Sequence, residues 1–212
     1  MSIVKIEEFG GKSLSRAEKL LAGIPGGVEK AVKSAMPRAV SHLQKQSYER
    51  IRERYAISEA NIREDETIKV EYHYGGGVQA VVRFSGHKIP LYRFDGASPK
   101  SPTYDKSKLV SALVSGGWKM VHPGAAASGH QLKGTAPTVF DNAFVAAMNA
   151  GDKKHVGIFE RVGNSIQELM GSSVAQMIGS DEVKEKLAED ASRKFEERME
   201  HEIDRLLNGW GG

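Results

Sequence analysis

HVGIFERV, at residues 155–162, is the stretch from which the fold of this chain is best read, and SIQELMGSSVAQMIG follows it at residues 165–179. The first stretch is short, apolar and rich in β-branched and aromatic residues, which predicts a strand. The second stretch leads into a long helix, and we expect it to display an irregular apolar surface between the sheet and that helix. No catalytic motif occurs in either stretch. This part of the chain therefore has the character of a surface that docks on a partner.

Residues 180–207 predict one long amphipathic helix. Ser180 can cap its N-terminus, and Asp181 and Glu182 place negative charge at the positive end of the helix dipole. No heptad repeat persists, so packing on a sheet or on a neighbouring subunit is favoured over a coiled coil. The face opposite the apolar stripe is almost wholly charged. The stripe consists of Val183, Leu187, Ala191, Phe195, Met199, Ile203 and Leu206.

The composition is that of an ordinary globular protein. The chain has 212 residues, of which 40% are hydrophobic, and this is enough to bury a sizeable core. No apolar run approaches the roughly 20 residues that cross a bilayer, and the N-terminus lacks a signal-peptide pattern, so we expect a protein made and kept in a cytosol, with no membrane partner. The absence of cysteine excludes disulfides, thiol catalysis and cysteine-based zinc sites. A net charge of +3 is too close to balance to name nucleic acid as the partner.

Residues 13–55 predict a helical region. A short helix at residues 13–21 ends at the breaker GIPGG, residues 23–27, and a much longer helix follows. Pro37 lies inside the longer pattern, so we expect either a kink there or two helices with Pro37 in the first turn of the second. The apolar stripe of the longer pattern consists of Val28, Val32, Ala35, Ala39, Leu43, Ser47, Ile51 and Tyr55.

Residues 66–162 predict a mainly antiparallel sheet. Alternating apolar residues and a GGG turn give a hairpin at residues 67–84, and a second pair of strands is expected at residues 109–122. Residues 89–94 contain Pro90 and belong at a sheet edge. Residues 95–105 read as an exposed loop, residues 123–137 as a mobile loop, and residues 140–150 as either a strand or a short helix. The predicted fold class is α+β, with this sheet flanked by the long N-terminal and C-terminal helices.

The order of these features resembles the minor tail protein Z family of tailed bacteriophages and prophages, over nearly the whole chain. The resemblance is carried by AMPRA at residues 35–39, RIRERYAI at 50–57, SG at 85–86 with IPLYRF at 89–94, and HVGIFER at 155–161. The most specific block is IQELMGSSV at residues 166–174, which leads to Met177 and Ile178. Ser165 and Ala175 stand where family members commonly have proline.

The resemblance implies a structural virion protein that acts late in assembly at the head-proximal end of a long tail, in tail completion, head-tail joining and positioning of DNA for delivery. Residues 1–212 would form a single tail-completion domain. The implied partners are copies of itself in a ring, with a hexamer as one candidate, and tail terminator, tail tube or head-tail connector proteins. Contact with DNA is a further option. The implied location is the tail neck of the virion, after assembly in the host cytoplasm, and no cofactor is expected.

A ring needs two different surfaces on each copy, and two segments are candidates: the edge strand at residues 89–94 and a contact loop at residues 166–178. An edge strand can pair with a partner's strand, and flexible apolar side chains can fill a neighbour's groove. The alternative for each segment is packing inside the same subunit. The candidate interface residues are Ile89, Leu91, Phe94, Ile166, Leu169, Met170, Met177 and Ile178.

The basic residues of the long N-terminal helix leave two readings open. Arg38, Lys45 and Arg52 are the candidates for facing DNA, and the alternative is a solvated helix face with Glu49 and Glu53 as partners. A DNA-binding or connector-type interaction module is therefore the alternative function. No known nucleic-acid motif occurs, and aromatic residues are not interleaved with the basic ones.

An enzyme, such as a hydrolase, would need a site built on scattered histidines. The sequence has no HExxH, GxSxG or GxxxxGK[ST] motif and no histidine pair at metal-ligand spacing, so it predicts no catalytic or metal site. The histidines that such a site would use are His73, His87, His122, His130 and His155, with Asp95, Asp105 or Asp141 as the carboxylate.

Overall fold

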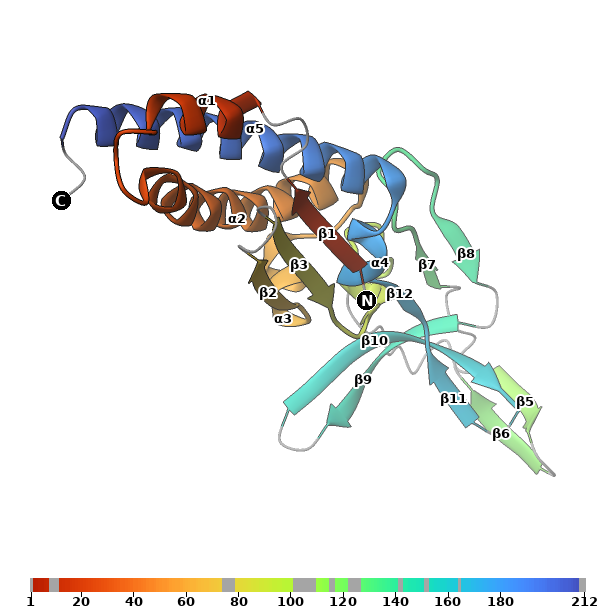
Figure 1. The fold of residues 1–212 in the computed structure, drawn as a ribbon. Coiled ribbons are helices and arrows are strands. Elements are labelled where there is room, and N and C mark those ends of the chain that lie inside the picture. The colour runs from red at the N-terminus through yellow and green to blue at the C-terminus, as the bar shows by residue number, and fades with distance from the viewer. Residues whose placement is uncertain are drawn as a thin grey trace. The chain divides into compact units, whose positions relative to one another are not determined.

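The computed structural model describes residues 2–7, 12–73, 79–100, 110–114, 117–121, 127–140, 143–150, 153–163 and 165–209. It confirms the predicted α+β class, with small antiparallel sheets and with helices near the N-terminus and the C-terminus of the chain (Figure 1). The expected single domain contains two compact units. The helical unit comprises Met1–Glu53, Glu66–Gly86 and Val174–Gly212, and the strand unit comprises Arg54–Asp65 and His87–Ser173.

The described part of the helical unit consists of four helices and one three-stranded sheet. The helices are α1 (Lys12–Leu20), α2 (Gly27–Arg54, whose last residue belongs to the strand unit), α4 (Val174–Ile178) and α5 (Asp181–Leu207). The strands are β1 (Ser2–Glu7), β2 (Thr67–His73) and β3 (Gln79–Ser85), in the order β1-β3-β2. α4 contacts β1, β3 and α5, and α5 also contacts β1 and α1. The core of this unit therefore lies between the helices and one face of the sheet.

The sheet of the helical unit confirms the predicted hairpin. β2 and β3 pair antiparallel, with Val70 opposite Val82 and Ile68 opposite Phe84. Ala80, Val82 and Phe84 share one face of the central strand and are fully buried, as expected of alternating residues on a half-buried sheet. The pairing of β1 with β3 was not predicted from the sequence.

The two long helices account for most of the core of the helical unit. All seven residues of the predicted α5 stripe are buried, which confirms the prediction from periodicity. α2 is one continuous helix with Pro37 in its interior. The expectation of a second helix that begins at Pro37 was therefore wrong. A proline in this position removes one backbone hydrogen bond, and the buried α2 residues on either side, such as Met36 and Val40, hold the helix together through packing.

The strand unit is built from short antiparallel pairs. It contains α3 (Glu59–Glu64), β4 (Lys88–Pro90), a 3-10 turn η1 (Leu91–Arg93), β5 (Val110–Val114), β6 (Gly117–Val121), β7 (Ala127–Gly129) and β8 (Thr138–Phe140). It continues through β9 (Ala143–Ala150), β10 (Lys153–Val162), β11 (Ser165–Glu168) and β12 (Met170–Ser173). The sheets are β11-β10-β9, β12-β4, β5-β6 and β7-β8. Residues 143–150, left open between strand and helix by the sequence, form a strand.

The predicted mobile loop at residues 123–137 contains a strand that the sequence did not predict, while residues 130–137 lie outside the helices and strands. Ala127–Gly129 form β7, which pairs with β8. Small residues allow this: Gly129 lies against Leu91, whose side-chain carbons would be 3.2 Å from an added Cβ, and Ala127 is fully buried. Residues 123–126 of that prediction, and residues 101–105 of the predicted loop at 95–105, lie outside the described residues. None of the described helices is long and apolar enough to cross a membrane.

Candidate interaction surfaces

The strand unit presents one face of the β11-β10-β9 sheet as a cluster of aromatic and charged side chains. Phe159 of β10 lies opposite Phe144 of β9 and Glu168 of β11. Alternate residues of a strand share a face, so His155, Phe159 and Arg161 lie on the same side of β10. The predicted strand at residues 155–162 thus forms the centre of this sheet.

A hydrogen-bonded pair lies over a glycine on this face. His155 Nε2 is 2.6 Å from Glu168 Oε1, and both side chains are half-buried. A Cβ at Gly157 would stand 2.3 Å from the same Oε1 atom, so only glycine leaves room for the carboxylate. The His155 ring meets Phe159 edge-on, with 6.4 Å between ring centroids. His155 therefore orients Glu168 across the strand pair.

Aromatic packing extends the cluster toward the end of β10. The rings of Phe144 and Phe159 have centroids 6.3 Å apart, and the guanidinium of Arg161 lies 5.5 Å from the Phe144 centroid. Both distances are within the range of favourable ring and cation–π contacts. Arg161 itself is exposed, so this end of the sheet offers a cation on an aromatic support.

Exposed apolar side chains are frequent along residues 162–170. Val162 is 52% exposed, Ile166 46% and Met170 41%. These are three of the seven large apolar residues that are exposed in the part of the chain that the structure describes, and they fall within nine consecutive positions. Ile166 lies opposite Arg161 and shares its face of the sheet, whereas Val162 lies on the other face. Isolated exposed apolar residues are normal, but their concentration in one segment favours a contact surface. We call residues 162–170 the docking segment.

The rest of the predicted contact loop is packed into the protein. Residues 166–178 are not a loop: they form β11, β12 and α4. In the strand unit, the Leu169 N–H donates to the Ile158 carbonyl oxygen, the Leu91 N–H donates to the Leu169 carbonyl oxygen, and the Ser172 N–H donates to Gln131 Oε1. Met177 and Ile178 are fully buried in the helical unit. Part of the sequence block IQELMGSSV thus connects two short sheets, because β11 and β12 belong to different sheets.

The candidate interface residues are accordingly divided by burial. Only Ile166 and Met170 are exposed, and Leu169 is half-buried. β4 does have a free edge within its two-stranded sheet, where it pairs only with β12. The remaining candidate interface residues are buried in the core, and packing inside the same subunit was the alternative that the sequence left open for them. The buried candidates are Ile89, Leu91, Phe94, Met177 and Ile178.

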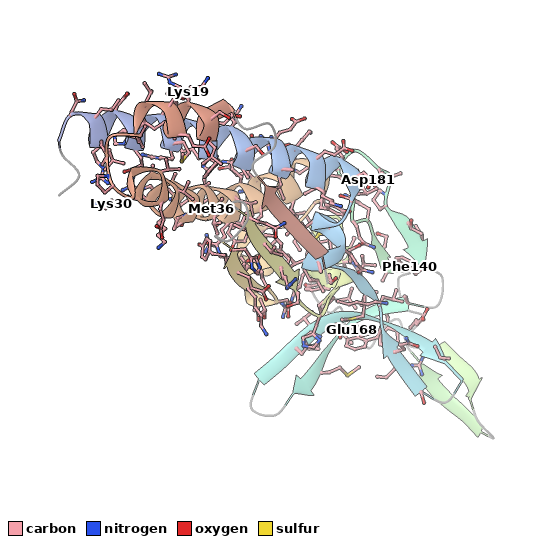
Figure 2. The ribbon with its side chains drawn as sticks, viewed as in Figure 1. Lys19, Lys30, Met36, Phe140, Glu168 and Asp181 are labelled. Carbon is pink, nitrogen blue, oxygen red and sulfur yellow. The ribbon has the colours of Figure 1, made fainter. Side chains whose placement is uncertain are left out.

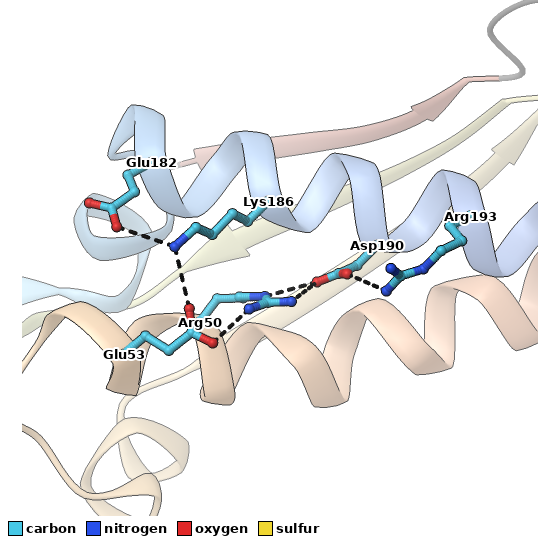
Figure 3. A network of polar contacts seen from close by, with 6 residues as sticks. All are labelled: Arg50, Glu53, Glu182, Lys186, Asp190 and Arg193. Atoms are coloured by element: carbon cyan, nitrogen blue, oxygen red, sulfur yellow. Dashed lines mark hydrogen bonds and ion pairs between the residues drawn. The ribbon is translucent and has the colours of Figure 1, made fainter.

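The helical unit is held together by ion pairs between α2 and α5. Arg50 donates to Asp190 from Nε at 2.8 Å, its Nη2 lies 2.7 Å from the same carboxylate oxygen, and Arg193 donates to the other oxygen (Figure 3). Asp190 is buried, and its hydrogen bond raises the pKa of Arg50 above the ordinary value. Lys186 Nζ lies 3.6 Å from Glu53 Oε2 and 3.3 Å from Glu182 Oε1, and these ion pairs extend the network along both helices.

A second pair links the same helices further along. Arg38 and Arg205 both donate to Glu202, whose side chain is only 1% exposed. Burial alone would raise the pKa of Glu202, but hydrogen bonds from Ser34 and Arg205, with the charges of Arg205 and Arg38, outweigh it and lower the pKa. The pairs 38–202 and 50–190 show that the two helices run antiparallel.

The three candidates for facing DNA have different surroundings. Arg38 is half-exposed and shares Glu202. Lys45 is exposed and has no ion pair to another described residue. Arg52 is exposed and interacts with a neighbour. These side chains lie on the outer face of α2, where contact with solvent or with a partner is possible.

Among the described residues, no histidine of the enzyme alternative is paired with one of its candidate aspartates. His155 pairs with Glu168 rather than with Asp95, while His122, Asp105 and Asp141 lie outside the described residues. His130 packs against Gly96, and its Nδ1 has no partner in the described part. No group of three His, Asp or Glu residues among those described could hold a metal ion.

Comparison with protein-family models, with curated proteins and with solved structures finds no match for this chain. The contacts that the sequence did not reveal are the His155–Glu168 pair and the support of Arg161 by Phe144. Both join residues far apart in sequence, and only the register of β9, β10 and β11 brings them together. The Gly157 position was the one available signal, because glycine within a strand often marks a close approach.

Proposed function

We propose that this protein is a structural virion subunit that assembles late at the head-proximal end of a long phage tail, where it completes the tail and helps to join it to the head. The observation that carries the proposal is the docking segment. Its exposed apolar residues Ile166 and Met170 fall in the part of the sequence that most specifically resembles the minor tail protein Z family.

The division of labour within that block supports the proposal. Glu168 and Gly171 each have a packing or hydrogen-bonding reason for their identity. Ile166 and Met170 have none that the folded chain itself supplies, since nearly half of each side chain is exposed. Methionine and isoleucine at such positions favour an adaptable apolar contact with another protein. The docking segment would bind a tail terminator, tail tube or connector protein.

The role is non-catalytic in this proposal, and the protein works through contacts. It would act as a homo-oligomeric ring in the tail neck, because a tail end has rotational symmetry and a ring subunit uses two different faces. A DNA-binding or connector-type module is the second candidate, and the exposed Lys30 and Lys45 on α2 favour it. Neither lysine has an ion pair to another described residue, so both are available to a polyanion.

Binding to tails assembled without the protein tests the proposal. The double variant Ile166→Asp with Met170→Asp places two charges in the docking segment, and we expect it to lose co-sedimentation with tails while its circular dichroism remains that of the wild type. Val139→Asp is the matched control, because Val139 is 59% exposed and lies in β8. Wild-type protein that does not bind such tails would refute the function, and a double variant that binds as well as the control would remove the docking segment from it.

A further inference from the structure

The two long helices of the helical unit carry opposite charge of equal size. α2 has seven Lys or Arg residues and three Glu residues, a net formal charge of +4. α5 has ten Asp or Glu residues and six Lys or Arg residues, a net formal charge of −4. A chain whose total charge is only +3 thus separates its charge between two elements.

Part of this charge is used inside the subunit, and part is left over. The pairs Arg38–Glu202 and Arg50–Asp190 join the two helices across their contact. The outer face of α2 still carries the exposed Lys30 and Lys45, about 22 Å apart at 1.5 Å per residue. Neither lysine has an ion pair to another described residue.

The outer face of α5 is acidic over most of its length. Steps of four and seven residues keep side chains on one side of a helix, so Glu185, Glu189 and Glu196 form a stripe about 16 Å long. These three glutamates are exposed and have no ion pair within the described part of the chain. Asp181 and Asp204, also exposed and unpaired there, extend the charge to both ends of the helix. Figure 2 shows Lys30 and Asp181 toward opposite ends of the antiparallel helix pair.

From this arrangement we infer that the contact between neighbouring copies of this protein is electrostatic: the basic outer face of α2 on one copy binds the acidic outer face of α5 on the next. The partner is a second copy because one chain presents both halves of the contact with opposite charge and on helices of nearly equal length, 28 and 27 residues. Like charges repel when either face meets its own kind, so each contact joins an α2 face to an α5 face. Where the two faces of one copy bind two different neighbours, the contact is heterologous, and it forms a ring when the rotation between copies closes.

This inference rests on the proposed function, because the ring is part of that proposal. The docking segment and the two helix faces have different binding partners in it. The docking segment binds the tail end, and the two helix faces bind neighbouring copies. DNA is the competing occupant of the basic face of α2. A polyanion would use Lys30 and Lys45 but would be repelled by the acidic face of α5, whereas a second copy uses both faces.

Complementary charge reversal tests the contact directly. One variant carries Lys30→Glu and Lys45→Glu, and the other carries Glu185→Lys and Glu189→Lys. The first variant then presents two acidic faces, and the second loses most of the acidic stripe that the basic face of α2 would bind, so we expect each alone to raise the apparent Kd of self-association at least about tenfold. A mixture of the two restores one native pair and one reversed pair of faces, and it should associate like the wild type. Sedimentation velocity in 50 mM and 500 mM NaCl measures this, and the higher salt should weaken association because it screens exposed charges.

A charge-matched control separates position from net charge. Lys133→Glu with Lys154→Glu makes the same change in total charge as the α2 variant, at exposed sites of the strand unit, and it should associate like the wild type. The inference is overturned if wild-type protein stays monomeric in 50 mM NaCl, if either helix variant associates like the control, or if the mixture fails to associate. It is also overturned if the α2 variant loses only DNA retention. Each of these outcomes leaves the binding of the docking segment to tails unaffected, so the two proposals fail separately.

Discussion

Replacing Glu202 with glutamine should destabilise the helical unit strongly, and only at a pH where the carboxylate is charged. Glu202 lies in α5 with a side chain that is 1% exposed, and it accepts hydrogen bonds from Arg38 and from Arg205, the latter at 2.7 Å. Glutamine keeps the size of the side chain but loses the negative charge. The variant therefore weakens two charge-assisted hydrogen bonds without creating a cavity.

The expected cost follows from these contacts. A hydrogen bond to a charged group contributes about 1.5–3 kcal/mol, but Arg38 and Arg205 are 50% and 35% exposed and can turn to water when the charge is lost. We therefore expect the free energy of unfolding to fall by about 1–3 kcal/mol in total at pH 7. Urea denaturation followed by circular dichroism at a helical wavelength measures it, because α2 and α5 supply most of the helix.

The pH dependence gives the sign of the effect. The pKa of Glu202 is lowered in the folded protein, so its stabilisation is complete above the unfolded value of about 4.3 and is lost as the pH falls through the folded value. The difference between wild type and Glu202→Gln should thus be full at pH 7 and shrink below about pH 4. Glu196→Gln, at an exposed site of the same helix, should change stability little. Equal unfolding energies for the two variants at pH 7 would refute the reasoning.

Three further variants test other contacts. Gly171→Ala would place a Cβ 2.5 Å from the buried Phe94 ring, and overpacking should cost about 1–3 kcal/mol by urea denaturation, whereas Gly23→Ala, with no atom within 4 Å, should not. Asp190→Asn should destabilise by about 1–3 kcal/mol because it takes the buried carboxylate away from Arg50 and leaves this guanidinium with the more exposed Glu53, and an effect no larger than that of the exposed Glu189→Gln would contradict this. Leu43→Ala should lower stability by about 2–5 kcal/mol, because Leu43 is fully buried in α2, while Lys45→Ala should leave thermal unfolding unchanged.

The helices of this protein could be predicted from periodicity, because burial on one face is a local property of the sequence. Val183, Leu187 and Phe195 recur every four or eight residues and are buried, and Ser180 stands at the predicted start of α5. Pro37 left the prediction divided between one kinked helix and two helices, because a proline disfavours a helix interior locally, and tertiary packing overrode that preference in α2. The antiparallel pairing of β2 and β3 was also local enough to predict, from the alternating apolar residues of the two strands.

The candidate surfaces depended on contacts that no local pattern contains. The apolar residues Ile89, Leu91 and Phe94 had two possible fates, and only the position of β12 and Gly171 decides that they are buried. β7 looked too small and glycine-rich to build core, but a buried strand that lies close to Leu91 requires small residues. The division of charge between α2 and α5 could be counted from sequence. Which charges are used internally follows only from the antiparallel contact of the two helices.

The central claim, that this protein completes the head-proximal end of a phage tail, is tested most directly by electron microscopy of tails made with and without it. Particles made with the gene deleted should have tails of normal length whose head-proximal ends lack one layer of density, and heads should fail to join them productively. Complementation with wild-type protein should restore that layer, and the Ile166→Asp, Met170→Asp variant should not. Tails that carry the same head-proximal density and join heads equally well without the protein would contradict the account.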